Sequence, residues 1–351
     1  MLAGSGAGRR GSWARRLTVA AGLVGGMLAM SGCSADEAMR FGWPEGVTPQ
    51  ARDMTTLWSW SVVAALIMGA LVWGLTFWTI TFHRKKEGTP DFPRQTGYNV
   101  PLELFYTAVP FVIVAILFYF TVLVQTKVEK MEPNPPVLVD VTAFQWNWRF
   151  GYREVKLDDG TQLNLEKPNP YGTQPKPGEA VMVDGKEKHG PNNGRFQEIR
   201  DYLHFSKIET QGSSAEIPVL VLPTNTRIEF DLASADVVHS FYVPQFAFKR
   251  DVFPNPQQNH TNNRFQISEI DRPGAFVGRC AEMCGDYHSM MNFEIRAVTP
   301  DKFAQYIKDR LAGEDNAAAL AAIGEQPQAV TTAPFNTRRT ARTASSVGEN
   351  N

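Results

Sequence analysis

Residues 278–291 read GRCAEMCGDYHSMM, and this stretch carries most of the chemistry in the chain. Cys280 and Cys284 are four residues apart, His288 follows four residues later, and Met291 three after that. Two thiolates, an imidazole and a thioether form a soft ligand set, which favours copper or an iron–sulfur cluster over hard ions. Two cysteines at this spacing can bridge two metal ions, so the stretch predicts a binuclear centre with a second imidazole from elsewhere in the chain.

His239 is the best candidate for that second imidazole among the six histidines. It lies within the apolar, strand-like run ADVVHSFYVP (residues 235–244), which a β-sandwich could carry to the cysteine loop. The alternative for Cys280 and Cys284 is a structural disulfide, which would suit an exported domain. Asp236, three residues before His239, is either a docking contact or an ordinary surface acid.

The two segments together resemble the binuclear copper A domain of subunit II of haem–copper cytochrome c oxidases. The resemblance implies two copper ions held by the side chains of His239, Cys280, Cys284, His288 and Met291 and by the backbone carbonyl of Glu282. It also implies that the Glu282 carboxylate helps to bind a magnesium ion shared with subunit I, a use that suits a hard oxygen ligand.

Composition limits the function classes. The 351 residues are 43% hydrophobic and carry a net charge of −1, which excludes a wholly disordered chain and gives no basis for binding nucleic acid. Three cysteines are an odd number, and Cys33 accounts for the unpaired one.

The amino end has the features of an export signal. Four arginines precede a short apolar run at residues 17–30, and the sequence MSGC ends at Cys33. This resembles a bacterial lipoprotein box, so residues 1–32 are predicted to be a signal peptide and Cys33 the lipidated first residue. An ordinary signal peptide with a spare cysteine is the alternative.

Two long apolar runs, at residues 57–82 and 102–126, are each long enough to span a membrane as a helix. The basic cluster HRKK at residues 83–86 places the intervening loop in the cytoplasm. The prediction is therefore an outer segment at 33–54, a transmembrane hairpin at 55–126 and a large extracytoplasmic domain anchored in the plasma membrane.

Glu103 begins the second of these helices, seven residues before Pro110. An acid there can simply complement the helix dipole. In the oxidase family, a glutamate at the matching position lies at the mouth of a proton-uptake path, so the resemblance implies that role for Glu103.

The outer domain is predicted at residues 127–312, with a disordered tail at 313–351. Alternation over residues 137–150 predicts one strand with an aromatic face, and the resemblance implies that Trp146, in its QWNW run, receives electrons from a cytochrome. Residues 151–215 are loop-like and resemble an insertion of actinobacterial oxidases. Short strands at 219–222, 227–232, 237–243, 264–270, 276–280 and 292–298 then predict a cupredoxin-like Greek-key β-sandwich, closed by a helix at 303–311.

The resemblance implies that the chain is subunit II of an aa3-type oxidase, which is an oxidoreductase. It also implies that the subunit is of the actinobacterial lipoprotein type. Electrons would pass from a cytochrome c, or from the cytochrome c of a bcc complex, to haem in subunit I, where dioxygen is reduced and protons are pumped. Subunits I and III and membrane lipid are the other expected partners. The competing interpretation is a membrane-tethered copper carrier, while a quinol oxidase subunit would lack the copper ligands and nitrous oxide reductase does not fit the two helices or the length.

Overall fold

The computed structural model describes residues 34–90, 92, 95–157, 159–169, 181–183, 186–188 and 202–334. The predicted signal peptide (residues 1–32) and Cys33 lie outside the described residues, as does most of the chain between 170 and 201. Two compact units are present, one formed by Met1–Glu45 and Trp58–Pro93 and the other by Gly46–Leu57 and Arg94–Asn351.

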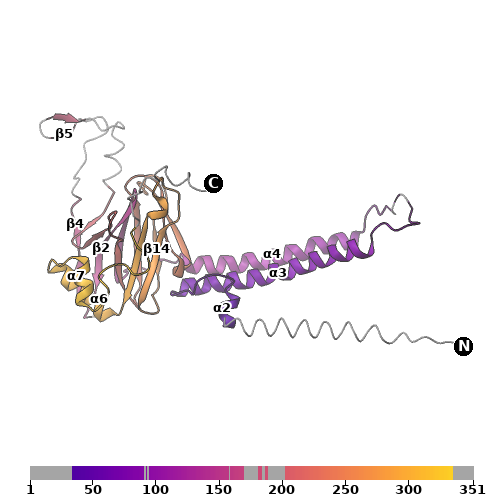
Figure 1. Cartoon of the computed structure of the whole chain (residues 1–351), viewed down its shortest axis with the longest axis horizontal. Helices are drawn as coiled ribbons and strands as arrows, with labels where there is room; N and C mark the ends of the chain where they lie inside the picture. The colour runs from indigo at the N-terminus through magenta and orange to yellow at the C-terminus, as the bar shows by residue number, and fades with distance from the viewer. Residues whose placement is uncertain are drawn as a thin grey trace, which may run out of the picture. The chain divides into compact units, whose positions relative to one another are not determined.

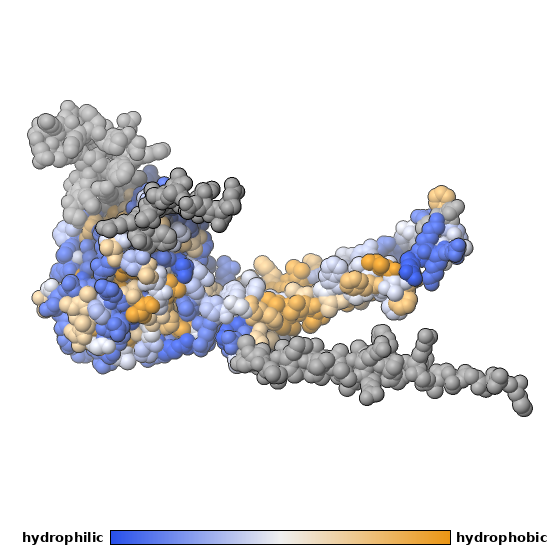
Figure 2. Space-filling model, in the orientation of Figure 1, coloured by the Kyte–Doolittle hydropathy of each residue, from blue (hydrophilic) through white to orange (hydrophobic). Residues whose placement is uncertain are grey.

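Both predicted membrane spans are helical. Helices α3 (Pro49–Phe82) and α4 (Val100–Val128) are long and apolar enough to cross a membrane, and their most apolar windows are not buried by protein. Figure 2 shows apolar residues over their surfaces, and Trp73 and Phe111 are 62% and 74% exposed. Surfaces of this kind are stable when lipid covers them.

Helix α3 begins earlier than predicted, inside the segment expected to be a separate outer stretch. That segment also contains the short helix α2 (Ala35–Met39). The first turn of α3 is polar, so hydropathy could not detect it, but it is fixed to the outer domain. Ala51 is fully buried, Gln50 Nε2 donates to Ser268 Oγ at 2.8 Å, and Arg52 forms an ion pair with Asp271.

The outer domain is a sandwich of two sheets, as predicted (Figure 1). One sheet has the order β13-β10-β1-β2-β3, with β8 also paired to β2, and the other has the order β12-β11-β14-β15-β9. The first sheet contains β1 (Val137–Phe144), β2 (Asn147–Lys156), β3 (Gln162–Asn164), β8 (Glu209–Gln211), β10 (Ile228–Ser234) and β13 (Arg264–Ile267). The second contains β9 (Val219–Pro223), β11 (His239–Val243), β12 (Phe248–Val252), β14 (Gly274–Cys280) and β15 (Asn292–Val298).

An aromatic cluster joins the two sheets. Trp148 and Phe230 from the first sheet pack with Phe241 and Phe293 from the second, at ring-centroid distances of 4.8–6.1 Å, and all four are essentially buried. Burying each ring contributes about 2 kcal/mol. A Cβ at Gly278 would lie 2.0 Å from the Phe293 ring, so only glycine permits this close packing.

The prediction of one strand over residues 137–150 is wrong. The segment is a hairpin in which β1 pairs antiparallel with β2, Phe144 faces Asn147, and Gln145 and Trp146 form the turn. The core-facing positions change parity across the turn, because Val141 and Ala143 of β1 lie opposite Phe150 and Trp148 of β2, so Phe144 is on the other face. The turn contains no glycine, asparagine or proline, so nothing in its composition predicted it.

Two further expectations need correction. The insertion was expected to begin at residue 151, but β2 continues to Lys156, and β3 and β8 also pair with it. Small sheets pair β4 (Glu166–Lys167) with β7 (Phe205–Ser206) and β5 (Val181–Val183) with β6 (Lys186–Lys188). Strand β12 was not predicted at all, because three of its five residues are charged.

The tail was expected to be disordered from residue 313, and this is wrong as far as residue 334. After the predicted closing helix, α6 (Pro300–Leu311), a second helix, α7 (Asn316–Ala322), packs against the sandwich. Asp315 caps α7 by accepting from Ala318 N at 2.7 Å, and Leu320 is fully buried in the core. The alanine-rich composition that suggested disorder is also that of a good helix.

Replacing Leu320 with alanine should therefore lower the free energy of unfolding by about 2–4 kcal/mol, because it removes a fully buried side chain. Denaturant unfolding of the detergent-solubilised chain measures this. Leu311→Ala is the matched control, since Leu311 is 43% exposed and should change stability little. Equal effects at both positions would mean that α7 does not belong to the folded core.

Candidate metal centre

The predicted metal ligands lie at one end of the sandwich, where β11 and β14 pair. His239 is the first residue of β11 and Cys280 the last of β14, and Phe241 is the register partner of Cys280. Residues 281–291 then form a loop to β15. Cys280 N donates to Met291 O at 3.0 Å, which closes the base of that loop.

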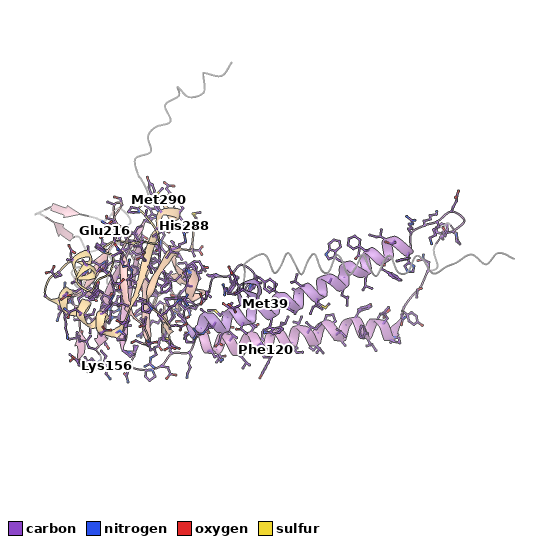
Figure 3. All side chains as sticks on the ribbon, turned by 60° about the horizontal axis from the view of Figure 1, so that its bottom comes forward. Met39, Phe120, Lys156, Glu216, His288 and Met290 are labelled. Carbon is purple, nitrogen blue, oxygen red and sulfur yellow. The ribbon has the colours of Figure 1, made fainter. Side chains whose placement is uncertain are left out.

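A second backbone bond holds the loop against β11, with Ala281 N donating to Ser240 O at 3.0 Å. The loop ends in the 3-10 turn η2 (His288–Met290), and Figure 3 shows His288 and Met290 at this end of the domain. Because the loop is fixed at its base and along its side, its side chains have defined positions.

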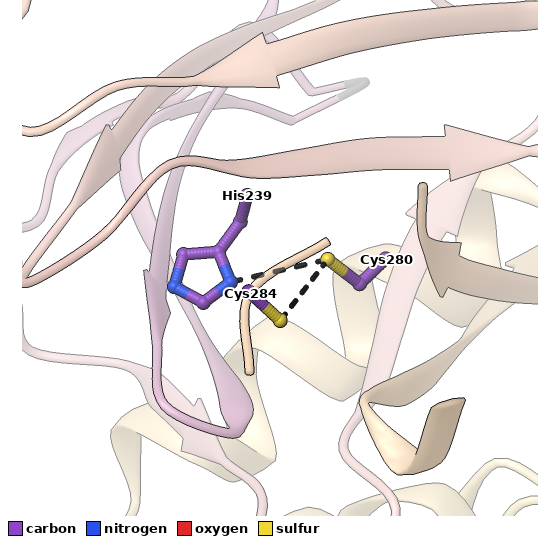
Figure 4. A group of neighbouring side chains, drawn as sticks. All are labelled: His239, Cys280 and Cys284. Atoms are coloured by element: carbon purple, nitrogen blue, oxygen red, sulfur yellow. Dashed lines mark hydrogen bonds between the residues drawn. The ribbon is translucent and has the colours of Figure 1, made fainter. Parts of the chain in front are cut away.

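The donor atoms form a continuous cluster. Figure 4 shows His239 and the two cysteines, with His239 Nδ1 3.9 Å from Cys280 Sγ and the two Sγ atoms 3.8 Å apart. Cys284 Sγ lies 3.5 Å from His288 Nδ1 and 3.9 Å from Met291 Sδ. Cys280 Sγ is 3.2 Å from the carbonyl oxygen of Glu282.

All six predicted ligand residues are thus brought together, and the soft donors suit copper. His239, Cys280 and Cys284 offer ligand atoms within 4.8 Å of one another, and all three side chains are buried. The cysteines are free, since a disulfide would need their sulfurs about 2.05 Å apart. The disulfide alternative is therefore not what this fold adopts.

In the metal-free chain, the pKa values of the two thiols are shifted in opposite directions. Burial raises the pKa of Cys280, but hydrogen bonds with His239 and with the backbone of Glu282 and Ser240 outweigh it and lower the pKa to about 6. Burial and the neighbouring Cys280 raise the pKa of Cys284 to about 12. One thiolate is therefore already present at neutral pH, and a metal must displace the proton of the second.

Asp236 binds the ring nitrogen of His239 that does not face the sulfurs, a role that the sequence did not indicate. Its Oδ1 lies 2.8 Å from His239 Nε2, which leaves Nδ1 facing the sulfurs. Backbone N–H groups of Gln145 and Val237 each donate to the Asp236 carboxylate at 2.7 Å. Although burial opposes it, the bond to His239 and these donors lower the pKa of Asp236. The only sequence signal was an acid three residues before the histidine.

Trp146 and its neighbour contact the metal loop directly. Trp146 Nε1 and Gln145 Nε2 both donate to the carbonyl oxygen of Cys284, at 3.0 and 2.8 Å. Tyr287 meets the Trp146 ring edge-on at 4.9 Å. Gly285 has φ +117°, and a Cβ there would lie 3.1 Å from the Trp146 ring, so glycine is required at this contact.

The remaining predicted residues lie apart from the donor cluster. The Glu282 carboxylate is 3.4 Å from Lys249 Nζ, which also contacts Asp251 at 2.7 Å, and its magnesium role stays a prediction. Glu103 accepts from Asn99 N at 2.9 Å while Asn99 accepts from Leu102 N at 3.3 Å, a capping arrangement at the start of α4. Its proton-uptake role, like lipidation of Cys33, is untested.

Comparison with known proteins agrees with this site. Residues 206–298 match the family described as cytochrome C oxidase subunit II, periplasmic domain. The chain is 58% identical over 346 residues to the probable cytochrome c oxidase subunit 2 of Nocardia farcinica, covering 96% of this chain and 92% of that protein. It is 52% identical over 341 residues to cytochrome c oxidase subunit 2 of Mycobacterium tuberculosis, with the same coverages.

The chain belongs to the cytochrome c oxidase subunit II family. Among solved structures, the periplasmic domain of subunit II of the Bradyrhizobium japonicum cytochrome oxidase aligns with a TM-score of 0.30 and 24% identity, covering 51% of this chain and 96% of that one. Family membership makes the chain part of a haem–copper oxidase, an oxidoreductase. The two apolar helices and the subunit II periplasmic domain indicate membrane insertion with the sandwich outside the cytoplasm.

Replacing Asp236 with asparagine should weaken copper binding by about 10–100-fold, because outer hydrogen bonds orient a ligating imidazole. Competition titration of the purified metal-free chain against a Cu(I) chelator measures the affinity. Asp286→Asn is the matched control, since this exposed acid lies in the metal loop and the change in charge is identical. Equal affinities for both variants would contradict a supporting role for Asp236.

Proposed function

We propose that this chain is the electron-accepting subunit of an aa3-type cytochrome c oxidase, with a binuclear copper A centre held by His239, Cys280, Glu282, Cys284, His288 and Met291. The observation that carries the proposal is the convergence of two cysteine sulfurs, two imidazoles, a thioether and a carbonyl from two segments of the chain. When bound by these residues, two copper ions would supply a one-electron carrier.

The fold keeps these metal-donor atoms in fixed positions. The loop is closed at its base, Asp236 orients His239, and two N–H groups bind the Cys284 carbonyl. A site that changes geometry little between two charge states loses little energy to reorganisation. Burial of the cysteines also weighs against the copper-carrier alternative, which needs an accessible ion to hand on.

Trp146 is the proposed route for electrons from the donor. It is half-buried in the β1–β2 turn, so one edge reaches the surface while Nε1 bonds to the Cys284 carbonyl. The proposed donor is a cytochrome c, in particular the cytochrome c of a bcc complex, and the proposed acceptor is haem in subunit I. Dioxygen reduction and proton pumping, with Glu103 as the proton-uptake residue, belong to the same proposal.

Electron paramagnetic resonance of the purified oxidase tests the copper assignment. The native chain should give a signal in which one unpaired electron is shared equally by two copper nuclei, and Cys284→Ser should abolish that sharing because one of the two cysteine sulfurs is lost. Ser289→Ala, an exposed change in the same loop, should leave the signal intact. A single-copper signal from the native chain would refute the proposal.

The insertion is proposed to dock the bcc complex. Its base is built into the fold, since Lys167 pairs with Phe205 and Asn169 Nδ2 donates to Leu203 O at 3.2 Å. Tyr202 also donates to the Ser234 carbonyl, which lies in the segment leading to His239. The base of the insertion therefore stands beside the loop that carries Asp236.

Replacing residues 171–200 with a short glycine–serine linker should spare this base and the copper signal but reduce co-purification of the bcc complex. A glycine–serine segment of the original length separates the effect of sequence from that of length. Affinity purification followed by protein quantification gives the ratio of the two complexes. Undiminished co-purification with both replacements would rule out the docking role.

A further inference from the structure

The short loop between β10 and β11 carries Asp236 to the imidazole of His239. It spans residues 235–238 and begins directly after Ser234, the last residue of β10. Ser234 is polar but fully buried. Its hydroxyl donates to the Val237 carbonyl oxygen and accepts from Asp236 N at 3.1 Å, so this one side chain closes the loop into a tight turn. The shape of the loop therefore depends on where Ser234 is held.

Three contacts from other segments fix the backbone at the start of this loop. Ser234 N donates to Phe253 O at 3.0 Å, and Ala235 N donates to Ala143 O at 2.8 Å. The third contact comes from Tyr202, whose hydroxyl donates to the Ser234 carbonyl oxygen. Phe253 follows β12 and Ala143 lies in β1, so these two contacts come from the sandwich itself. Tyr202 instead belongs to the base of the insertion.

The ring of Tyr202 is held against the sandwich, which gives its hydroxyl a defined position. With Ala235, it packs against a small cluster of buried residues, Leu203, Phe205 and Ala233. Burial raises the pKa of Tyr202 to about 12; a backbone hydrogen bond opposes this rise, and the negative charge of Asp236 adds to it. The phenol therefore keeps its proton at physiological pH and remains a hydrogen-bond donor.

These contacts form an unbroken path from the insertion to a proposed metal ligand. Tyr202 binds the carbonyl oxygen of Ser234, and the hydroxyl of Ser234 binds the backbone of Asp236. Asp236 Oδ1 then lies 2.8 Å from His239 Nε2. From the other side, Gln145 N donates to Asp236 Oδ2 at 2.7 Å. The carboxylate is thus held by the β1–β2 turn and by its own loop, and Tyr202 anchors the loop.

We propose that Tyr202 is a positioning residue for the His239 imidazole and acts through Ser234 and Asp236. Hydrogen bonds beyond the first ligands fix the orientation of a ligating imidazole, and here they reach back to the insertion. The inference rests on the proposed function, because it takes His239 as a copper ligand. The insertion then contributes to the geometry of the metal centre, in addition to its proposed docking role.

A double-mutant cycle on copper affinity tests this proposal. Tyr202→Phe removes only the hydroxyl and keeps the ring in its cluster. It should weaken Cu(I) binding to the purified metal-free chain by about three- to tenfold, because it acts one step further from the ligand than Asp236→Asn. In the Asp236→Asn background the same change should have almost no effect, since the path to His239 is already broken. Competition against a Cu(I) chelator measures all four affinities.

Tyr152→Phe is the matched control. Tyr152 Oη donates to the Val221 carbonyl oxygen at 2.7 Å, so this variant also removes a phenol that binds the backbone of the same domain. Val221 lies in β9, which contains none of the six proposed ligands. Tyr152→Phe should therefore destabilise the fold but leave the Cu(I) affinity unchanged.

Hydrogen–deuterium exchange of the metal-free chain gives a second readout, which needs no copper. Tyr202→Phe should raise the exchange rate of the backbone amides at residues 235–237 severalfold, because the loop loses one of its anchors. The amides of β9 should exchange as they do in the native chain.

The proposal is overturned if Tyr202→Phe changes neither the loop exchange nor the Cu(I) affinity, or if it changes only one of them. Effects of Tyr202→Phe and Asp236→Asn that simply add, or an equal loss of affinity in Tyr152→Phe, would also overturn it. Failure of the proposed function would appear differently, as a native chain without a two-copper signal whose loop exchange still responds to Tyr202→Phe.

Discussion

The pairing of β11 with β14 is the constraint on which the site depends. Residues about forty apart in sequence become neighbours because Phe241 opposes Cys280 and Ala281 bonds to Ser240. The same pairing places His239 beside the first sulfur and starts the ligand loop from a fixed point. The end of a β-sandwich is rigid and holds the attached loop in place, so the loop need not be rigid by itself.

Hydrogen bonds around the cluster then orient the donors. Asp236 fixes one imidazole, and the β1–β2 turn binds the carbonyl of Cys284 with two N–H groups. The turn and Asp236 are themselves joined, because Gln145 N donates to the Asp236 carboxylate. The β1–β2 turn, the segment of Asp236 and His239, and the loop of Cys284 therefore stabilise one another. Trp146, which is half-buried, belongs to the first of these.

The sequence predicted the sandwich and the donor residues because both leave local signals, short alternating strands in one case and sulfur and imidazole spacing in the other. It did not predict the turn, strand and helix that form because of tertiary contacts. The β1–β2 turn lacks turn residues, the charged edge strand β12 lacks alternation, and α7 resembles a low-complexity tail until Leu320 is seen in the core. Asp236 was visible in the sequence, but its bond to His239 and the donor from Gln145 are contacts of the folded chain.

One contact links the interior of the domain to its metal loop. Trp148, in the centre of the aromatic cluster, donates from Nε1 to the carbonyl oxygen of Met291 at 3.2 Å. In mononuclear blue-copper sites the weak methionine ligand tunes the reduction potential, and Met291 is the thioether of the proposed copper centre here. Under the proposed copper assignment, interior packing and redox tuning would not be independent, and a substitution deep in the hydrophobic layer would alter the reduction potential of the centre.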